Sequence, residues 1–206
     1  MRIDEILALA PVMPVVTIEA PATAVPLARA LLAGGLRAIE VTLRTPAALD
    51  AVRLIAEGAP EMLVGVGTVL AAEDLEAAAQ AGASFAVSPG LTPVLAEAAR
   101  ASPLPYLPAV ATASEVMVAL EHGFRTLKFF PAAAAGGPGA LKALAGPFPS
   151  VRFCPTGGIE PASAPAYLAL SNVTCVGGSW MAPRDALANG DFVTIERLAR
   201  DAARLR

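Results

Sequence analysis

Short apolar runs alternate along the whole chain with longer segments in which apolar residues recur at helical spacing. The short runs are mostly β-branched or otherwise apolar, which is typical of strands buried on both faces of a parallel sheet. The runs that predict strands are residues 12–16, 38–42, 63–67, 85–88, 106–109, 126–129, 152–155 and 175–178. A helical pattern follows each of them, and no break in the alternation marks a linker.

This rhythm of strand and helix predicts an α/β fold built as one domain over residues 1–206. Eight strand–helix units in a chain of this length are typical of a (β/α)8 or TIM barrel. Residues 2–9 predict a further short N-terminal helix, placed to close the bottom of the barrel. A doubly wound open sheet is the alternative.

Composition agrees with this fold class and limits the partners. Hydrophobic residues make up 55% of the chain but aromatic residues only 5%, which suits small-residue helices packed on buried strands. The formal charge is −3 and Lys and Arg are not clustered, so we expect no nucleic-acid partner. Every long apolar stretch is interrupted, and the N-terminal segment carries acids, so we expect no membrane contact and a cytoplasmic location.

A lysine inside a predicted strand is the first candidate for chemistry. Lys128 stands between Leu127 and Phe129, where an unpaired ammonium would be costly to bury. Such a lysine snorkels to solvent, pairs with an acid, or gives up its proton and becomes a nucleophilic amine. By itself the position favours a structural role over a catalytic one, because ion pairs also shelter lysines.

A second strand carries polar residues at alternate positions. In residues 39–44, Glu40, Thr42 and Arg44 share one face of the predicted strand. A carboxylate near an amine could move protons during covalent catalysis, although Glu40 could equally be a buried partner for Lys128. The guanidinium of Arg44 suits a substrate carboxylate, and an exposed surface position is its structural alternative.

Two glycine-rich segments end the last two predicted strands, Thr156-Gly157-Gly158 and Gly177-Gly178-Ser179. Barrels commonly bind phosphate in this location, and glycine lets backbone N–H groups approach an anion closely. Ser179 and Thr156 add hydroxyl donors. Tight turns are the structural alternative, but two such segments in these positions favour a phosphate site.

The sequence gives little support for a metal-binding or nucleotide-binding site. His122 is the only histidine, so a histidine-rich metal cluster cannot form, and we expect no metal ion. The first predicted strand is not followed by a dinucleotide-binding glycine motif, and Gly139 is not followed by the Lys-Ser or Lys-Thr of a nucleotide loop. Cys154 and Cys175 lie in apolar runs and are expected to be buried thiols.

The order of several motifs resembles the 2-keto-3-deoxy-6-phosphogluconate aldolase family, also called 4-hydroxy-2-oxoglutarate aldolase. The likeness covers almost the whole chain. The segments that carry it are Ile-Glu-Val-Thr-Leu-Arg-Thr at 39–45, Val-Gly-Thr-Val-Leu at 66–70, Ser-Pro-Gly-Leu-Thr at 88–92, Lys-Phe-Phe-Pro at 128–131, Arg-Phe-Cys-Pro-Thr-Gly-Gly-Ile at 152–159 and Gly-Gly-Ser-Trp at 177–180.

The resemblance implies a class I aldolase of the Entner–Doudoroff pathway that needs no cofactor. It would cleave 2-dehydro-3-deoxy-6-phosphogluconate to pyruvate and glyceraldehyde 3-phosphate through a Schiff base on Lys128, with Glu40 as general acid and base. It further implies a homotrimer. The remaining implied site residues are Arg44 and Thr68 for the pyruvyl carboxylate, Gly157, Gly158, Gly178 and Ser179 for the phosphate, and Pro89, Phe130 and Thr156 for the pocket wall.

Other functions stay open from the sequence. The chain could act on the galactonate epimer or on 4-hydroxy-2-oxoglutarate, which would yield pyruvate and glyoxylate. It could also be a non-catalytic barrel that binds phosphate or a keto acid, or a metal-dependent enzyme, which the single histidine disfavours. Two departures from the family pattern, Ala109 in place of Gly and alanines at 133–135, bear on pocket shape and subunit contacts only.

Overall fold

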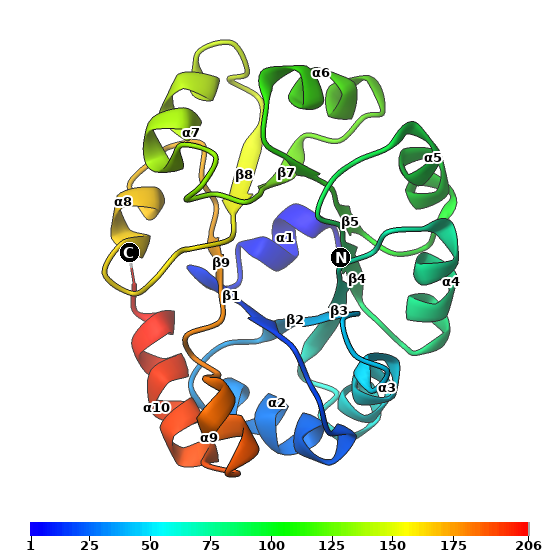
Figure 1. Ribbon diagram of the computed structural model, residues 1–206, viewed down its shortest axis with the longest axis vertical. Helices are drawn as coiled ribbons and strands as arrows, with labels where there is room; N and C mark the ends of the chain where they lie inside the picture. Colours follow the sequence, from blue (N-terminus) through cyan, green and yellow to red (C-terminus); the bar gives the residue numbers. More distant parts are fainter. Residues whose placement is uncertain (206) are drawn as a thin grey trace.

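Parallel strands curl around the centre of the molecule, and helices lie around their outside (Figure 1). The computed structural model describes residues 1–205. Its strands are β1 (Val12–Val16), β2 (Ala38–Thr42), β3 (Leu63–Gly67), β4 (Phe85–Val87), β5 (Tyr106–Leu107), β6 (Ala109–Val110), β7 (Thr126–Phe129), β8 (Arg152–Pro155) and β9 (Val176–Gly178). They pair in the orders β5-β4-β3-β2-β1-β9 and β6-β7-β8, always in parallel. The predicted α/β fold with a parallel sheet is therefore confirmed.

Helices connect nearly all consecutive strands, as the alternation predicts. They are α1 (Ile3–Leu7), α2 (Ala24–Ala33), α3 (Ala48–Gly58), α4 (Ala72–Gln80), α5 (Pro93–Ala101), α6 (Ala113–Glu121), α7 (Gly137–Ala145), α8 (Ala164–Leu168), α9 (Arg184–Ala188) and α10 (Phe192–Ala203), with a 3₁₀ turn at Pro21–Thr23. Their apolar stripes pack on the outer face of the sheet. Fully buried Leu27, Leu31 and Ile55 of the helices join Ile39 and Val41 of β2 in one core.

One predicted strand, residues 106–109, is divided into β5 and β6. Pro108 lies between the two pieces and has no N–H to give to a neighbouring strand. Its carbonyl still accepts a hydrogen bond from the Lys128 N–H at 2.9 Å. Elsewhere in residues 1–205, isolated bridges of Phe153 with Val173 and of Thr156 with Gly177 join the two sheets between β8 and the β9 segment.

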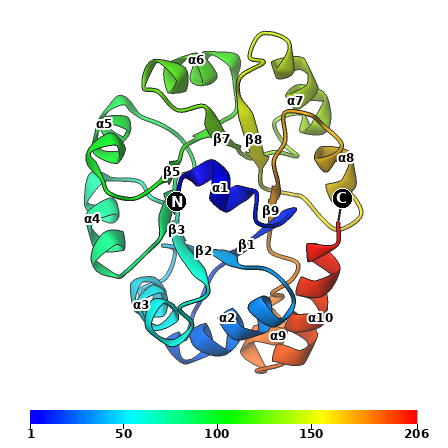
Figure 2. The ribbon, with the colours of Figure 1, turned by 180° about the vertical axis from the view of Figure 1, so that it is seen from behind.

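The short N-terminal helix lies across the strands on one side of the sheet (Figure 2). Ile6 and Leu7 of α1 are buried against a small cluster that includes Met13, Phe85 and Cys175, residues near the start of their strands. Cys154 belongs to the same cluster, and its Sγ lies 3.6 Å from that of Cys175. Both thiols are free and buried, as predicted. This end of the sheet is filled, so an open site has to lie at the opposite end.

Candidate active site

The inner face of β2 carries the polar side chains that the alternation predicts. Ile39 and Val41 point into the outer core and are fully buried, whereas Glu40 and Thr42 lie on the other face. Arg44 follows the end of the strand and is exposed. Period-two geometry thus places one carboxylate deep within the curled sheet and one guanidinium near its mouth.

An ion pair between Glu40 and Lys128 lies at the bottom of the site. The Nζ of Lys128 is 3.1 Å from Oε1 and 3.5 Å from Oε2 of Glu40. The residues are only 5% and 3% exposed, so both charges are held away from water. Nζ also lies 5.4 Å from the centre of the Phe130 ring. The structure therefore brings the two predicted catalytic residues together from β2 and β7.

This arrangement is compatible with both roles considered for Lys128, a structural ion pair and a nucleophilic amine. The carboxylate stabilises the buried ammonium, and breaking such a pair by removing one partner is costly. The same carboxylate lies within proton-transfer distance of the amine, so it can take a proton from Nζ and return one. Among the charged side chains of residues 1–205, these two form the only ion pair buried in the interior.

Gly67 on β3 is a site residue that the sequence did not single out. It is the register partner of Thr42 on the neighbouring strand. A Cβ placed on Gly67 would overlap the carboxylate of Glu40. The Glu40 carboxylate therefore occupies the space that a side chain at position 67 would fill. Glycine at this position is what allows the carboxylate to lie there.

Replacing Gly67 with alanine should displace the Glu40 carboxylate from Lys128 and lower kcat by about 10²-fold, the scale expected when an acid–base group is misplaced. The matched control is Gly139→Ala, because a Cβ there meets nothing within 4 Å. Steady-state kinetics of both variants, with circular dichroism to verify folding, make the test. Full activity in the folded Gly67→Ala variant would show that the position of Glu40 is not critical.

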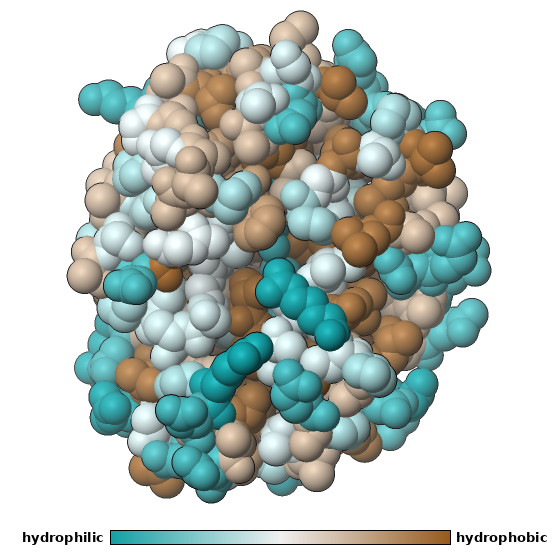
Figure 3. All heavy atoms as spheres, viewed as in Figure 1, coloured by the Kyte–Doolittle hydropathy of each residue, from teal (hydrophilic) through white to brown (hydrophobic). Residues whose placement is uncertain are grey.

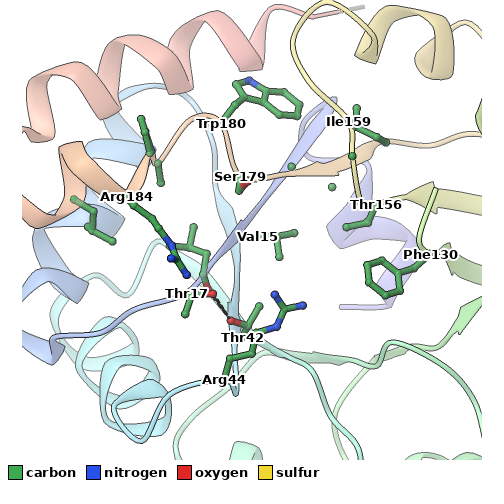
Figure 4. Close-up of a pocket in the computed structure, with 18 residues that line it drawn as sticks. Val15, Thr17, Thr42, Arg44, Phe130, Thr156, Ile159, Ser179, Trp180 and Arg184 are labelled. Atoms are coloured by element: carbon green, nitrogen blue, oxygen red, sulfur yellow. Dashed lines mark hydrogen bonds between the residues drawn. The ribbon is translucent and has the colours of Figure 1, made fainter. Parts of the chain in front are cut away.

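An open cavity of about 460 Å³ is lined by Thr42 and Phe130, the residues two positions after Glu40 and Lys128 (Figure 4). Its wall contains most of the predicted binding residues, namely Arg44, Phe130, Thr156, Gly157, Gly158, Gly178 and Ser179. It also contains residues that the sequence analysis missed, among them Thr17, Trp180 and Arg184. The hydroxyls of Thr17 and Thr42 lie 2.8 Å apart in this wall. The cavity combines hydroxyl, backbone and guanidinium groups and has no acidic side chain in its wall.

The predicted glycine-rich segments form one side of the cavity. Gly157 and Gly158 have φ of +101° and +72°, a conformation that favours glycine. The N–H groups of Gly157, Gly158 and Ser179 donate to no acceptor within residues 1–205. Added Cβ atoms on Gly177 and Gly178 would overlap Thr156 and Trp180. These glycines are thus needed for packing and also leave backbone donors free for an anion.

Two predicted binding residues, Thr68 and Pro89, are not part of the cavity wall. Thr68 lies just after β3 with φ of +65°, unusual for a β-branched residue, and its hydroxyl accepts a hydrogen bond from Arg44 Nε at 3.3 Å. Thr68 therefore acts on the site by orienting Arg44.

Pro89 follows Ser88, whose Oγ accepts a hydrogen bond from the Tyr106 hydroxyl at 2.6 Å. Burial raises the pKa of Tyr106 to about 12, so this phenol stays protonated.

The described part of the chain, residues 1–205, contains no cluster of three or more His, Cys, Asp or Glu side chains arranged to bind a metal ion. None of its helices is both long and apolar enough to cross a bilayer.

Comparison with known proteins gives a consistent result. A family model described as "Aldolase: KDPG and KHG aldolase" matches residues 3–198. The KHG/KDPG aldolase of Escherichia coli (strain K12) is 52% identical over 199 residues, which cover 97% of this chain and 93% of that protein.

Two solved structures are also closely similar. The Legionella pneumophila KDPG aldolase, with pyruvate captured as a covalent carbinolamine intermediate, superimposes with a TM-score of 0.97 at 45% identity, over 98% of both chains. The 2-keto-3-deoxy-6-phosphogluconate aldolase of Zymomonas mobilis ZM4, with 3-phosphoglycerate, gives a TM-score of 0.93 at 50% identity, over 98% of this chain and 95% of that one.

Proposed function

Because the chain belongs to the KDPG and KHG aldolase family and is a carbon–carbon lyase, we propose that it cleaves 2-keto-3-deoxy-6-phosphogluconate through a Schiff base on Lys128. The observation that carries this assignment is the buried Lys128–Glu40 pair, 3.1 Å apart, on the strands whose following residues, Thr42 and Phe130, line a cavity with anion-binding groups. The products are pyruvate and glyceraldehyde 3-phosphate. The proposed steps use side chains alone and need no metal or organic cofactor.

The reaction begins when Glu40 takes a proton from Lys128 and the neutral amine attacks the C2 carbonyl. Glu40 returns this proton to the former carbonyl oxygen, then carries a second proton from the nitrogen to the same oxygen, which leaves as water and gives an iminium ion. Support for this step comes from the Legionella relative, in which pyruvate was captured as a carbinolamine.

Bond cleavage follows from the electron demand of the iminium ion. Glu40 accepts the proton of the C4 hydroxyl, the C3–C4 bond breaks, and its electron pair moves toward nitrogen, leaving an enamine and a free aldehyde. Protonation of the enamine at C3 and hydrolysis of the resulting iminium ion then release pyruvate and restore the amine. The low exposure of both residues keeps bulk water from intercepting the enamine.

The cavity accounts for the two anionic ends of the substrate. Arg44, oriented by Thr68, would bind the carboxylate next to C2. Gly157, Gly158, Gly178 and Ser179 would hold the phosphate through backbone N–H and hydroxyl donors. Phe130 and Thr156 shape the wall. The Zymomonas relative, solved with 3-phosphoglycerate, shows that a similar fold accepts a small phosphorylated carboxylate.

The dual name of the Escherichia coli relative favours a second substrate, 4-hydroxy-2-oxoglutarate. The direct test is a coupled assay for pyruvate with purified protein and each keto acid, including the galactonate epimer. We expect fastest release from the phosphorylated gluconate derivative, and slower release from 4-hydroxy-2-oxoglutarate. If none of these keto acids yields pyruvate, the proposed substrate assignment is wrong.

The finer architecture is also a proposal. The chain continues from β5 of one sheet through Pro108 into β6 of the other, and this continuity, together with the bridges between β8 and the β9 segment, supports a closed (β/α)8 barrel. Hydrophobic atoms gather on the right of the cavity face, over α5 and its neighbours (Figure 3). Leu70 and Val94 are 67% and 74% exposed, which supports burial in a homotrimer. Light scattering after size-exclusion chromatography should give three times the chain mass of 20.8 kDa, and a monomeric mass would contradict it.

A further inference from the structure

Two arginines, and no acidic residue, line the cavity of about 460 Å³. Arg44 follows β2, whereas Arg184 is the first residue of α9, beyond the glycine-rich end of β9. Both side chains extend into the cavity, where their guanidinium groups lie near Thr17 and Thr42 (Figure 4). The cavity thus presents two fixed positive charges from different elements.

Arg184 has no partner that explains its position. Within residues 1–205 its guanidinium makes no ion pair and no hydrogen bond, unlike Arg53 and Arg200, each of which pairs with a carboxylate on its own helix. Glu19 lines an adjoining hollow with Arg184 but forms no salt bridge with it. The positive charge of Arg184 is therefore available to a ligand in the cavity.

The location of Arg184 relates it to the distal end of the substrate. It lies five positions after Ser179, in the segment that leaves the glycine-rich end of β9, and it lines the same cavity as Gly178 and Ser179. The Arg44 guanidinium instead donates to the Thr68 hydroxyl, just after the ends of β2 and β3. Backbone N–H groups can donate to any small oxyanion, whereas a guanidinium adds a full charge and forked donors that favour a phosphate dianion over a neutral hydroxyl.

On the basis of the proposed function, we infer that Arg184 is a specificity-determining residue that makes the site select phosphorylated over unphosphorylated keto acids. It contacts the distal phosphate directly and takes no part in the steps at Lys128. The glycine-rich segments position the phosphate, and Arg184 supplies the charge that distinguishes it from a hydroxyl. Since Arg184 is exposed, its contribution should decrease at high salt.

The test compares kcat/KM for 2-keto-3-deoxy-6-phosphogluconate and for unphosphorylated 2-keto-3-deoxygluconate in the parent protein, Arg184→Ala and Arg184→Lys. We expect Arg184→Ala to lower the ratio of the two values by about tenfold, mainly through KM of the phosphorylated substrate. Arg184→Lys should keep part of the preference. Arg100→Ala, an exposed arginine of α5 outside the cavity, is the matched control and should leave the ratio unchanged.

Salt gives a second readout. Raising the ionic strength should lower the preference of the parent protein for the phosphorylated substrate more than that of Arg184→Ala. An unchanged ratio in Arg184→Ala, or an equal loss on both substrates, would overturn the role of Arg184 while leaving the proposed aldolase reaction intact. If the parent protein cleaves neither substrate, the proposed function itself fails.

Discussion

Replacing Lys128 with methionine should lower the rate of carbon–carbon cleavage by about 10⁴-fold or more, because no other group can form the Schiff base. The matched control is Lys142→Met, since Lys142 is the only other lysine of the chain and is exposed on α7. That variant should retain the parent rate. Pyruvate release under single-turnover conditions makes the comparison.

Loss of Lys128 also leaves Glu40 buried without its partner, which lowers stability. A double variant, Lys128→Met with Glu40→Gln, removes both charges and should regain much of the lost thermal stability. It should remain inactive, which separates the chemical role of the amine from its role in folding. Turnover close to the parent rate in a folded Lys128→Met protein would exclude a Schiff base on Lys128.

Replacing Glu40 with glutamine should lower kcat by about 10²–10⁴-fold, the range usual for a general acid–base group, because the amide cannot move protons. Nζ should still react with pyruvate, only more slowly, so an adduct remains detectable. Glu97→Gln, at an exposed position of α5, is the control and should have no effect. A normal rate for the folded Glu40→Gln variant would remove Glu40 from the mechanism.

Local pattern predicts much of this fold because strand and helix periodicity depend on neighbouring residues. Strands 38–42 and 63–67 agree with β2 and β3 at every residue. The pattern does not predict the boundaries of an element where tertiary contacts determine them. β4 ends at Val87, one residue before the predicted end, and the Ser88 hydroxyl that follows donates to the Gly90 carbonyl; the strand at 106–109 divides at Pro108. The N-terminal helix is shorter than residues 2–9 and keeps only the turn that packs on the sheet.

The buried pair at the candidate site was also predictable, for a related reason. Lys128 and Glu40 are charged residues within apolar strands, a conflict with burial that is visible in the sequence alone. Gly67 and Arg184 carry no such signal. The role of Gly67 depends on a side chain from the neighbouring strand, and Arg184 looks like any charged residue at the start of a surface helix. Only the three-dimensional arrangement assigns them to the site.

The central claim is that Lys128 carries the substrate as an imine. Incubation with pyruvate and borohydride tests it most directly, because reduction makes the imine permanent and the chain has just two lysines. Peptide mapping by mass spectrometry should find a pyruvyl adduct on Lys128 and none on Lys142. The absence of an adduct, or an adduct on Lys142 alone, would contradict the proposed mechanism.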